Sequence, residues 1–119
     1  MKVVIYRLGQ HHYATPIEKI HSIERILPIR PIPGADSYVL GVANLRGSVI
    51  AVHDLRKMLE VEERELTAES RLLISEDIGY VVDEALDIAD CSQDVWEQVG
   101  ERKVWQHEDQ LIVWEELGA

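Results

Sequence analysis

Short apolar stretches alternate with turn residues along the chain, roughly every eight to twelve residues, a spacing typical of β-sandwiches and small barrels. Valine, isoleucine and leucine dominate the apolar positions and phenylalanine is absent, which favours strands. No strand–helix–strand alternation appears. We therefore predict an all-β protein, with strands near residues 3–8, 11–17, 22–29, 39–45, 49–52, 71–75, 78–83, 85–89, 103–106 and 110–114.

Helical and irregular segments are expected to be short. Asp54 has the residue type and position of an N-cap for a helix that runs through Leu59. A second helical turn is expected around Val95, Trp96 and Val99. Three prolines and a glycine within residues 28–34 prevent regular strand pairing, so this segment is predicted to be an extended connector across the outside of a barrel.

The apolar pattern lapses between residues 60 and 70, where five of the ten positions from 60 to 69 are glutamate. A run of this kind is typical of a solvated linker. We therefore expect a single domain of residues 1–119 with two lobes. Lobe one comprises roughly residues 1–59, the acidic linker residues 60–70, and lobe two roughly residues 71–119.

Basic and acidic residues are also distributed unevenly along the chain, with the change near residue 60. The net charge of the 119 residues is −10, which argues against nucleic acid as a partner because phosphate contacts need basic residues. Residues 1–59 carry eight Lys or Arg and four Asp or Glu, whereas residues 60–119 carry four and eighteen. No apolar run approaches the ~20 residues needed to cross a bilayer, so no direct membrane insertion is expected.

The sequence contains no set of residues that converges on a chemical reaction. The five histidines have no placed nucleophile or partner base, and the single cysteine, Cys91, is expected to fill a core position. One cysteine leaves no spacing typical of zinc ligands, and the seven glycines are dispersed. We predict no catalytic residues, no metal and no cofactor, and therefore a protein that is not an enzyme.

One segment is more specific than the rest of the chain. Residues 38–56 read YVLGVANLRGSVIAVHDLR. An aromatic residue and a glycine precede Asn-Leu-Arg-Gly, a hydrophobic strand follows, and Asp-Leu-Arg ends the segment. This order resembles the signature of CheW-like domains. Residues 6–14 resemble the opening hairpin of that family and residues 78–84 its Val-Asp strand, so the resemblance covers nearly the whole chain.

The resemblance implies two small five-stranded SH3-like barrels packed together. It also implies a chemotaxis adaptor with three partners: a CheA-type histidine kinase, the cytoplasmic tip of chemoreceptors, and other CheW-like modules. Such a protein is cytoplasmic and is recruited to membrane receptor arrays. On this interpretation the oppositely charged halves of the chain should attract opposite lobes of neighbouring modules.

The resemblance also implies which residues face partners. Arg46 at the end of a hairpin could bind a partner carboxylate or form an intramolecular bridge, and the resemblance favours the interface. The residues expected to bind partners are Arg46, Asn44, Ile20, Ser22, Val42 and Val39, and those expected to shape turns are Gly41 and Gly47. Gly41 is also expected to permit a close approach of another stretch of backbone. The three tryptophans, Trp96, Trp105 and Trp114, are expected in the core more than at an interface.

Three departures from the family pattern leave alternatives open. The chain is short near residues 75–78 and 100–104, which suggests an abbreviated second barrel. Ala51 replaces a common proline, and Ser22 replaces a common glutamate in the region tied to receptor coupling. A regulatory or decoy module, which binds kinase or receptor without coupling them, is therefore the alternative function. An enzyme or small-ligand protein on a barrel scaffold is the third.

Overall fold

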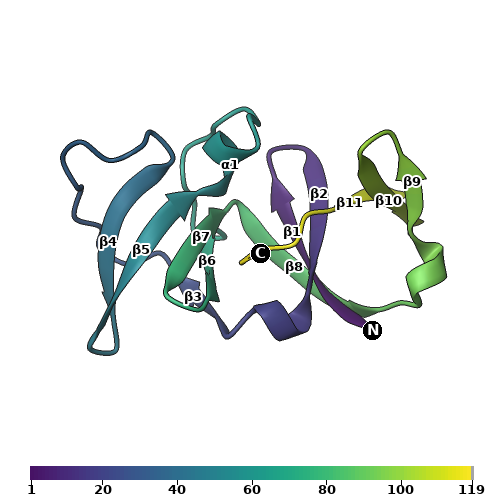
Figure 1. The fold of residues 1–119 in the computed structure, drawn as a ribbon, viewed down its shortest axis with the longest axis horizontal. Coiled ribbons are helices and arrows are strands. Elements are labelled where there is room, and N and C mark those ends of the chain that lie inside the picture. Colours follow the sequence, from purple (N-terminus) through teal and green to yellow (C-terminus); the bar gives the residue numbers. More distant parts are fainter. Residues whose placement is uncertain (119) are drawn as a thin grey trace.

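The computed structural model describes residues 1–118 and contains two β-lobes side by side along the long axis of the molecule (Figure 1). The five-stranded lobe has the strand order β3-β6-β7-β5-β4. Its elements are β3 (Ser22–Arg25), β4 (Val39–Leu45), β5 (Ser48–Asp54), helix α1 (Leu55–Met58), β6 (Arg71–Ser75) and β7 (Ile78–Val82).

The six-stranded lobe has the strand order β8-β1-β2-β11-β10-β9. Its strands are β1 (Lys2–Leu8), β2 (His11–Pro16), β8 (Glu84–Asp90), β9 (Glu97–Val99), β10 (Arg102–His107) and β11 (Gln110–Trp114). Two 3-10 turns complete it, η1 (Ile17–Lys19) and η2 (Gln93–Val95). The predicted all-β fold of two small packed barrels is confirmed. Tight turns lie at residues 76–77 and 100–101, within the two segments expected to be short.

Two local predictions differ from the structure. The helical turn expected around Val95, Trp96 and Val99 is η2 followed by β9, because Glu97–Val99 pair with β10. The strand expected over residues 22–29 ends at Arg25. Beyond it the chain crosses the open side of the five-stranded lobe and pairs with β4 at one bridge, between Arg30 and Val42.

The lobes do not follow the expected division of the chain at residue 60. Strands β1 and β2 belong to the six-stranded lobe, whereas β3, β4 and β5 join β6 and β7 in the other. The chain crosses between the lobes at η1 and again at Asp83. Residues 60–70, the expected linker, instead connect α1 to β6 within one lobe. Pairing between strands that are far apart in the sequence decides which strands share a lobe. A local change in composition does not reveal that pairing.

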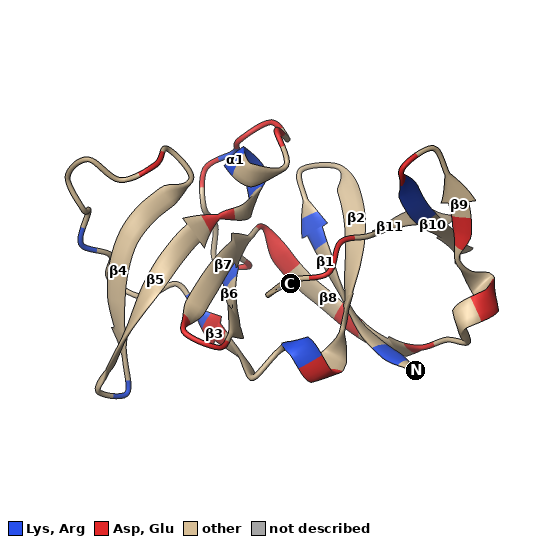
Figure 2. Ribbon diagram, viewed as in Figure 1, with Lys and Arg blue, Asp and Glu red and all other residues tan. Residues whose placement is uncertain are grey.

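This topology also removes the expected charge difference between the lobes. Residues 21–83, which form the five-stranded lobe, carry seven basic and eleven acidic residues. The rest of the chain carries five and eleven. Acidic and basic residues lie in both lobes (Figure 2). The premise that the two lobes carry opposite net charge is therefore wrong, since both lobes are net negative.

Three clusters of buried apolar residues form the core. One lies inside each lobe, and the third joins them. We call this third one the interlobe cluster; its buried members are Tyr6, Leu8, Tyr13, Leu55, Leu73, Tyr80, Val82 and Leu117. Strand β1 is buried on both faces, because Val3 and Ile5 pack inside its own lobe while Tyr6 and Leu8 enter the interlobe cluster.

Gly41 lies within β4, at a register shift rather than in a tight turn. Its φ is 147°, and a Cβ there would lie 2.0 Å from the carbonyl oxygen of Arg30. The chain that crosses the open side of the five-stranded lobe therefore approaches β4 closely only because residue 41 has no side chain.

We expect Gly41→Ala to lower the free energy of unfolding by more than about 3 kcal/mol, from backbone strain and from the clash with Arg30. Gly47→Ala is the matched control: Gly47 also has a positive φ, 88°, but a Cβ there meets nothing within 4 Å. Its loss should be about 1–2 kcal/mol. Urea unfolding measures both, and equal losses would show that the close approach to Arg30 is unimportant.

Candidate partner-binding site

Arg46 lies at the tip of the β4–β5 hairpin, with a φ of 48° and a side chain that is 69% exposed. Its two terminal nitrogens reach the carboxylate of Glu24, with Nη2 2.8 Å from Oε2 and Nη1 3.3 Å from Oε1. Glu24 is on β3, and β3 and β4 are the two ends of the strand order. The ion pair therefore joins opposite edges of the five-stranded lobe and leaves one face of the guanidinium in solvent.

Ser22 also forms a hydrogen bond with Glu24, beside the Arg46–Glu24 ion pair. Hydrogen bonds from Arg46 and, less strongly, from Ser22 lower the pKa of Glu24. Ser22 and Glu24 lie two residues apart on β3 and so share a face of the strand. A carboxylate is thus present beside the hairpin tip although residue 22 itself is a serine.

Asn44 and Gly47 form the turn itself. The side-chain oxygen of Asn44 accepts a hydrogen bond of 2.9 Å from the backbone N–H of Gly47. Gly47 has a φ of 88° and open space beside it, as a turn glycine does. Asn44 is exposed, so this side chain both closes the turn and lies on the surface.

A hollow of about 530 Å³ lies beside this hairpin, and we call it the hairpin groove. Val42, Asn44 and the strongly exposed Val49 line it from the hairpin. Its remaining lining residues are Pro28, Arg30 and Ala43. The groove is largely apolar with one basic side chain, a surface suited to an apolar partner segment that carries acidic residues.

The other two residues expected to bind partners lie elsewhere. Val39 is half-buried at the far end of β4, next to His53 of β5. Ile20 is half-buried against the interlobe cluster, so its side chain supports the core between the lobes. The structure therefore brings Val42, Asn44 and Arg46 together and separates Ile20 and Val39 from them.

A second exposed apolar surface was not predicted from the sequence. Ile23 on β3 and Leu86 and Ile88 on β8 are large, exposed apolar side chains, with Ile88 51% exposed. Together with Val4, Ala85 and Asp87 they line a hollow of about 290 Å³ that we call the interlobe groove. Its walls come from both lobes. Alternating apolar residues in β8 are visible in the sequence, but only the fold shows that they face solvent beside β3.

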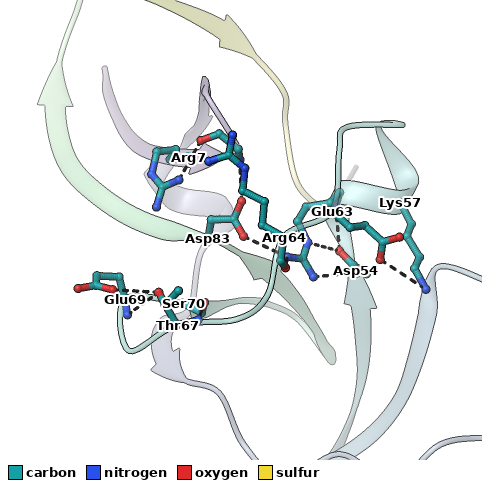
Figure 3. A network of polar contacts seen from close by, with 11 residues as sticks. Arg7, Asp54, Lys57, Glu63, Arg64, Thr67, Glu69, Ser70 and Asp83 are labelled. Carbon is teal, nitrogen blue, oxygen red and sulfur yellow. Dashed lines mark hydrogen bonds and ion pairs between the residues drawn. The ribbon is translucent and has the colours of Figure 1, made fainter.

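A charged network lies buried between α1 and the crossing point at Asp83 (Figure 3). Arg56 of α1 is 5% exposed, and its Nε and Nη2 contact the two carboxylate oxygens of Asp54 at 2.9 and 3.1 Å. Its Nη1 lies 3.2 Å from Oδ1 of Asp83 and also donates to the backbone carbonyl of Arg64. Hydrogen bonds to Asp54 raise the pKa of Arg56, despite its burial.

Asp54 and Asp83 are themselves 1% and 5% exposed, so the network is one cation between two buried carboxylates. Asp54 also accepts a hydrogen bond from the backbone N–H of Arg56, so it caps α1 as predicted. The sequence alone shows Asp-Leu-Arg as part of a family signature and does not reveal that Arg56 pairs with a second carboxylate. That carboxylate belongs to Asp83, which is 27 residues away from Arg56.

The three tryptophans pack together against the apolar cluster of the six-stranded lobe and are half-buried. Trp96 contacts both of the others, with ring centroids 5.5 Å from Trp105 and 5.0 Å from Trp114. They are core residues at the edge of the lobe, and Cys91 is buried in the same cluster.

Residues 1–118 contain no group of three or more His, Cys, Asp or Glu side chains that could hold a metal ion. Over the same residues, no helix has the length and apolar character needed to cross a membrane.

The comparisons with known proteins agree with one another. The sequence model of the CheW-like domain family matches residues 2–110. The chemotaxis protein CheW of Bacillus subtilis is 37% identical over 91 residues, which are 73% of this chain and 58% of that protein. The chemotaxis protein CheW of Rhizobium meliloti is 30% identical over 95 residues, which are 76% and 61%. The matches thus span about three-fifths of these relatives.

A solved structure gives the same result. The crystal structure of the scaffolding protein TtCheW from Thermoanaerobacter tengcongensis has a TM-score of 0.89 and 25% sequence identity to this chain. The similarity covers 98% of this chain and 84% of that one. The resemblance found in the sequence is therefore confirmed, at the level of sequence and of fold.

The buried imidazole of His53 makes the stability of the fold depend on pH. Its imidazole lies edge-on to the rings of Tyr38 and Tyr80, and its Nδ1 is buried without a hydrogen-bond partner. Burial lowers the pKa of His53 below the usual 6.5, because the charged form is disfavoured there. Burial, followed by the charges of Arg7 and His11, also lowers the pKa of His12.

A lowered pKa in the folded state means that the unfolded chain takes up protons first as the pH falls. The stability contributed by neutral His53 is complete above the unfolded pKa of about 6.5 and is lost as the pH falls below it. We expect His53→Gln to make the free energy of unfolding fall less steeply between about pH 7.5 and pH 5. Urea unfolding at several pH values measures this, and identical slopes would contradict it.

Proposed function

The chain belongs to the CheW-like domain family, and we propose that it is a non-enzymatic adaptor that couples a CheA-type histidine kinase to chemoreceptors. Other CheW-like modules are its third class of partner. The proposed location is the cytoplasm, where the protein is recruited to membrane receptor arrays by its partners and does not itself insert into the membrane.

The observation that carries the proposal is the presence of two exposed apolar grooves on one body. The interlobe groove and the hairpin groove share no lining residue. An adaptor must hold two partners at once, and two separate grooves meet that requirement. Exposed apolar surface is also costly in water unless a partner covers it, which supports docking at both places.

We assign the interlobe groove to the receptor. Its exposed side chains, Ile23, Leu86 and Ile88, form an apolar surface between two lobes, and an amphipathic helix binds a groove of this kind through its apolar face. Ser22 and Ile20 lie beside it in the chain. The loss of the common glutamate at residue 22 then changes the edge of the receptor site and leaves its apolar floor intact.

We assign the hairpin groove to the kinase. Val42 and Asn44 line it and Arg46 lies at the adjacent tip. A partner carboxylate can reach the solvent-facing side of the Arg46 guanidinium while Glu24 holds the other side, because a guanidinium has five donors.

Reconstitution tests the proposal against the alternatives. The protein is mixed with the purified kinase and with receptor cytoplasmic fragments on vesicles, and kinase autophosphorylation is measured. Activation that requires all three components supports the adaptor. Binding to kinase or receptor without activation supports the decoy module, and failure to bind either supports the third class.

Substitution in the interlobe groove provides a sharper test. We expect Ile88→Glu to weaken receptor binding by more than about 2 kcal/mol, the loss expected when a central apolar contact becomes a buried charge. Val99→Glu is the matched control, since Val99 is 58% exposed on edge strand β9 and lies outside both grooves. Calorimetric titration with the receptor fragment measures both. Equal losses of receptor affinity in the two variants would show that the receptor does not bind at β8.

Substitution of Arg46, followed by titration with the kinase, tests the hairpin groove. An exposed ion pair contributes about 0–1 kcal/mol to folding, so Arg46→Ala should barely change the melting temperature. Kinase affinity should fall by about 2 kcal/mol or more if the guanidinium is central to the interface.

Arg102→Ala is the control for that substitution, because Arg102 forms a comparable ion pair of 2.9 Å with Glu115 in the other lobe. A large drop in melting temperature with unchanged kinase affinity for Arg46→Ala would identify Arg46 as a structural residue.

A further inference from the structure

Asp83 lies at the point where the chain leaves the five-stranded lobe and enters the six-stranded lobe, between β7 and β8. Its carboxylate contacts both lobes. Oδ1 is 3.2 Å from Nη1 of Arg56 in the five-stranded lobe. Oδ2 accepts a hydrogen bond of 2.6 Å from the backbone N–H of Gly9, at the β1–β2 turn of the other lobe.

Two further contacts hold the chain at this crossing. The N–H of Asp83 donates to the carbonyl of Arg7 at 3.0 Å. The Arg7 guanidinium in turn pairs with Glu84, the first residue of β8, at 3.2 Å. The direction in which β8 leaves the crossing is therefore set by contacts at residues 83 and 84.

That direction decides the shape of the interlobe groove. Leu86 and Ile88 lie on β8, a few residues after Asp83, while Ile23 lies on β3 of the other lobe. The groove therefore exists only at a particular angle between the lobes. The interlobe cluster holds the lobes together, but apolar packing is non-directional, whereas the hydrogen bonds of a buried carboxylate have defined distances and angles.

We propose that Asp83 is a positioning residue: its bridge between Arg56 and Gly9 fixes the angle between the lobes and so presets the interlobe groove for its partner. The partner part of this inference rests on the proposed function. The conformational part does not, because it concerns only the angle between the lobes.

The experiment uses Asp83→Asn in the full chain. The amide oxygen can still accept from the Gly9 N–H, but the attraction to Arg56 is lost, while Arg56 keeps both of its contacts to Asp54. The matched control is Glu115→Gln, which removes the charge from an ion pair of 2.9 Å that lies within one lobe.

Two measurements are made on each variant. Pulsed electron paramagnetic resonance measures the distance between nitroxides on Ser48→Cys in β5 and Gln98→Cys in β9, in a Cys91→Ala background. Calorimetric titration measures the affinity for the receptor fragment and for the CheW-like module of the kinase. Circular dichroism shows that each variant is folded before it is used.

We expect Asp83→Asn to broaden the distance distribution. If about a tenth of the molecules keep the lobe angle that forms the groove, the receptor dissociation constant rises about tenfold. Kinase affinity should stay within about twofold, because the hairpin groove lies within one lobe, and Glu115→Gln should leave all three quantities unchanged.

A folded Asp83→Asn protein with the wild-type distance distribution would overturn the inference, whatever its affinities. A broadened distribution with unchanged receptor affinity would overturn the link between lobe angle and receptor. If the wild-type protein binds no receptor, the proposed function fails, and the distance distribution alone then decides whether Asp83 sets the angle.

If Asp83→Asn does not fold, the same measurements are made on Arg56→Lys, which keeps a cation but loses the guanidinium fork that contacts Asp54 and Asp83 together. Broadening in that variant supports the inference, and an unchanged distribution overturns it.

Discussion

The arrangement of the two lobes depends on one buried guanidinium. Arg56 lies between the carboxylates of Asp54 and Asp83, all three of them at most 5% exposed. A buried charge is strongly unfavourable unless it is paired, and a network is favourable only when each member keeps its partners. This condition restricts where α1, the β1–β2 turn and the start of β8 can lie. These three segments therefore have to lie close together, and their contact places the two lobes side by side.

The rest of the architecture is consistent with that constraint. Strand β1 is buried on both faces, so neither lobe is complete without the other. The chain begins in the six-stranded lobe, forms the whole five-stranded lobe and then returns at Asp83, and its C-terminal tail packs Leu117 between the two. For an adaptor this matters, because a partner that binds across two lobes needs them at a defined angle.

The fold class could be predicted from the sequence because alternating apolar residues and regularly spaced turns are local signals. The Asp54 cap and the turn at Gly47 were predicted for the same reason. Which strands share a lobe could not be predicted, since β1 pairs with β8 across more than seventy residues of chain. The charge difference between the two halves of the chain was equally misleading, because the halves are not the lobes.

The candidate site was predicted in part. Val42, Asn44 and Arg46 follow one another along a single hairpin, so their proximity is visible in the sequence. The pairing of Arg46 with Glu24 is not, because it joins opposite edges of a curled sheet. The interlobe groove escaped prediction for a related reason: alternation along β8 shows that Leu86 and Ile88 share a face, but not whether that face meets the core or the solvent.

A double-mutant cycle between Arg56 and Asp83 measures whether these two side chains are coupled across the boundary between the lobes. Urea unfolding gives the free energy of unfolding for the wild type, Arg56→Met, Asp83→Asn and the double variant. Removal of the buried cation alone should be severe, about 3–5 kcal/mol, because two buried carboxylates are then left unpaired. We expect an interaction energy of about 0.5–3 kcal/mol between the two substitutions, with the double variant less destabilised than the sum of the single variants. Losses that add within about 0.5 kcal/mol would show that the two residues act independently, and that this ion pair does not join the lobes.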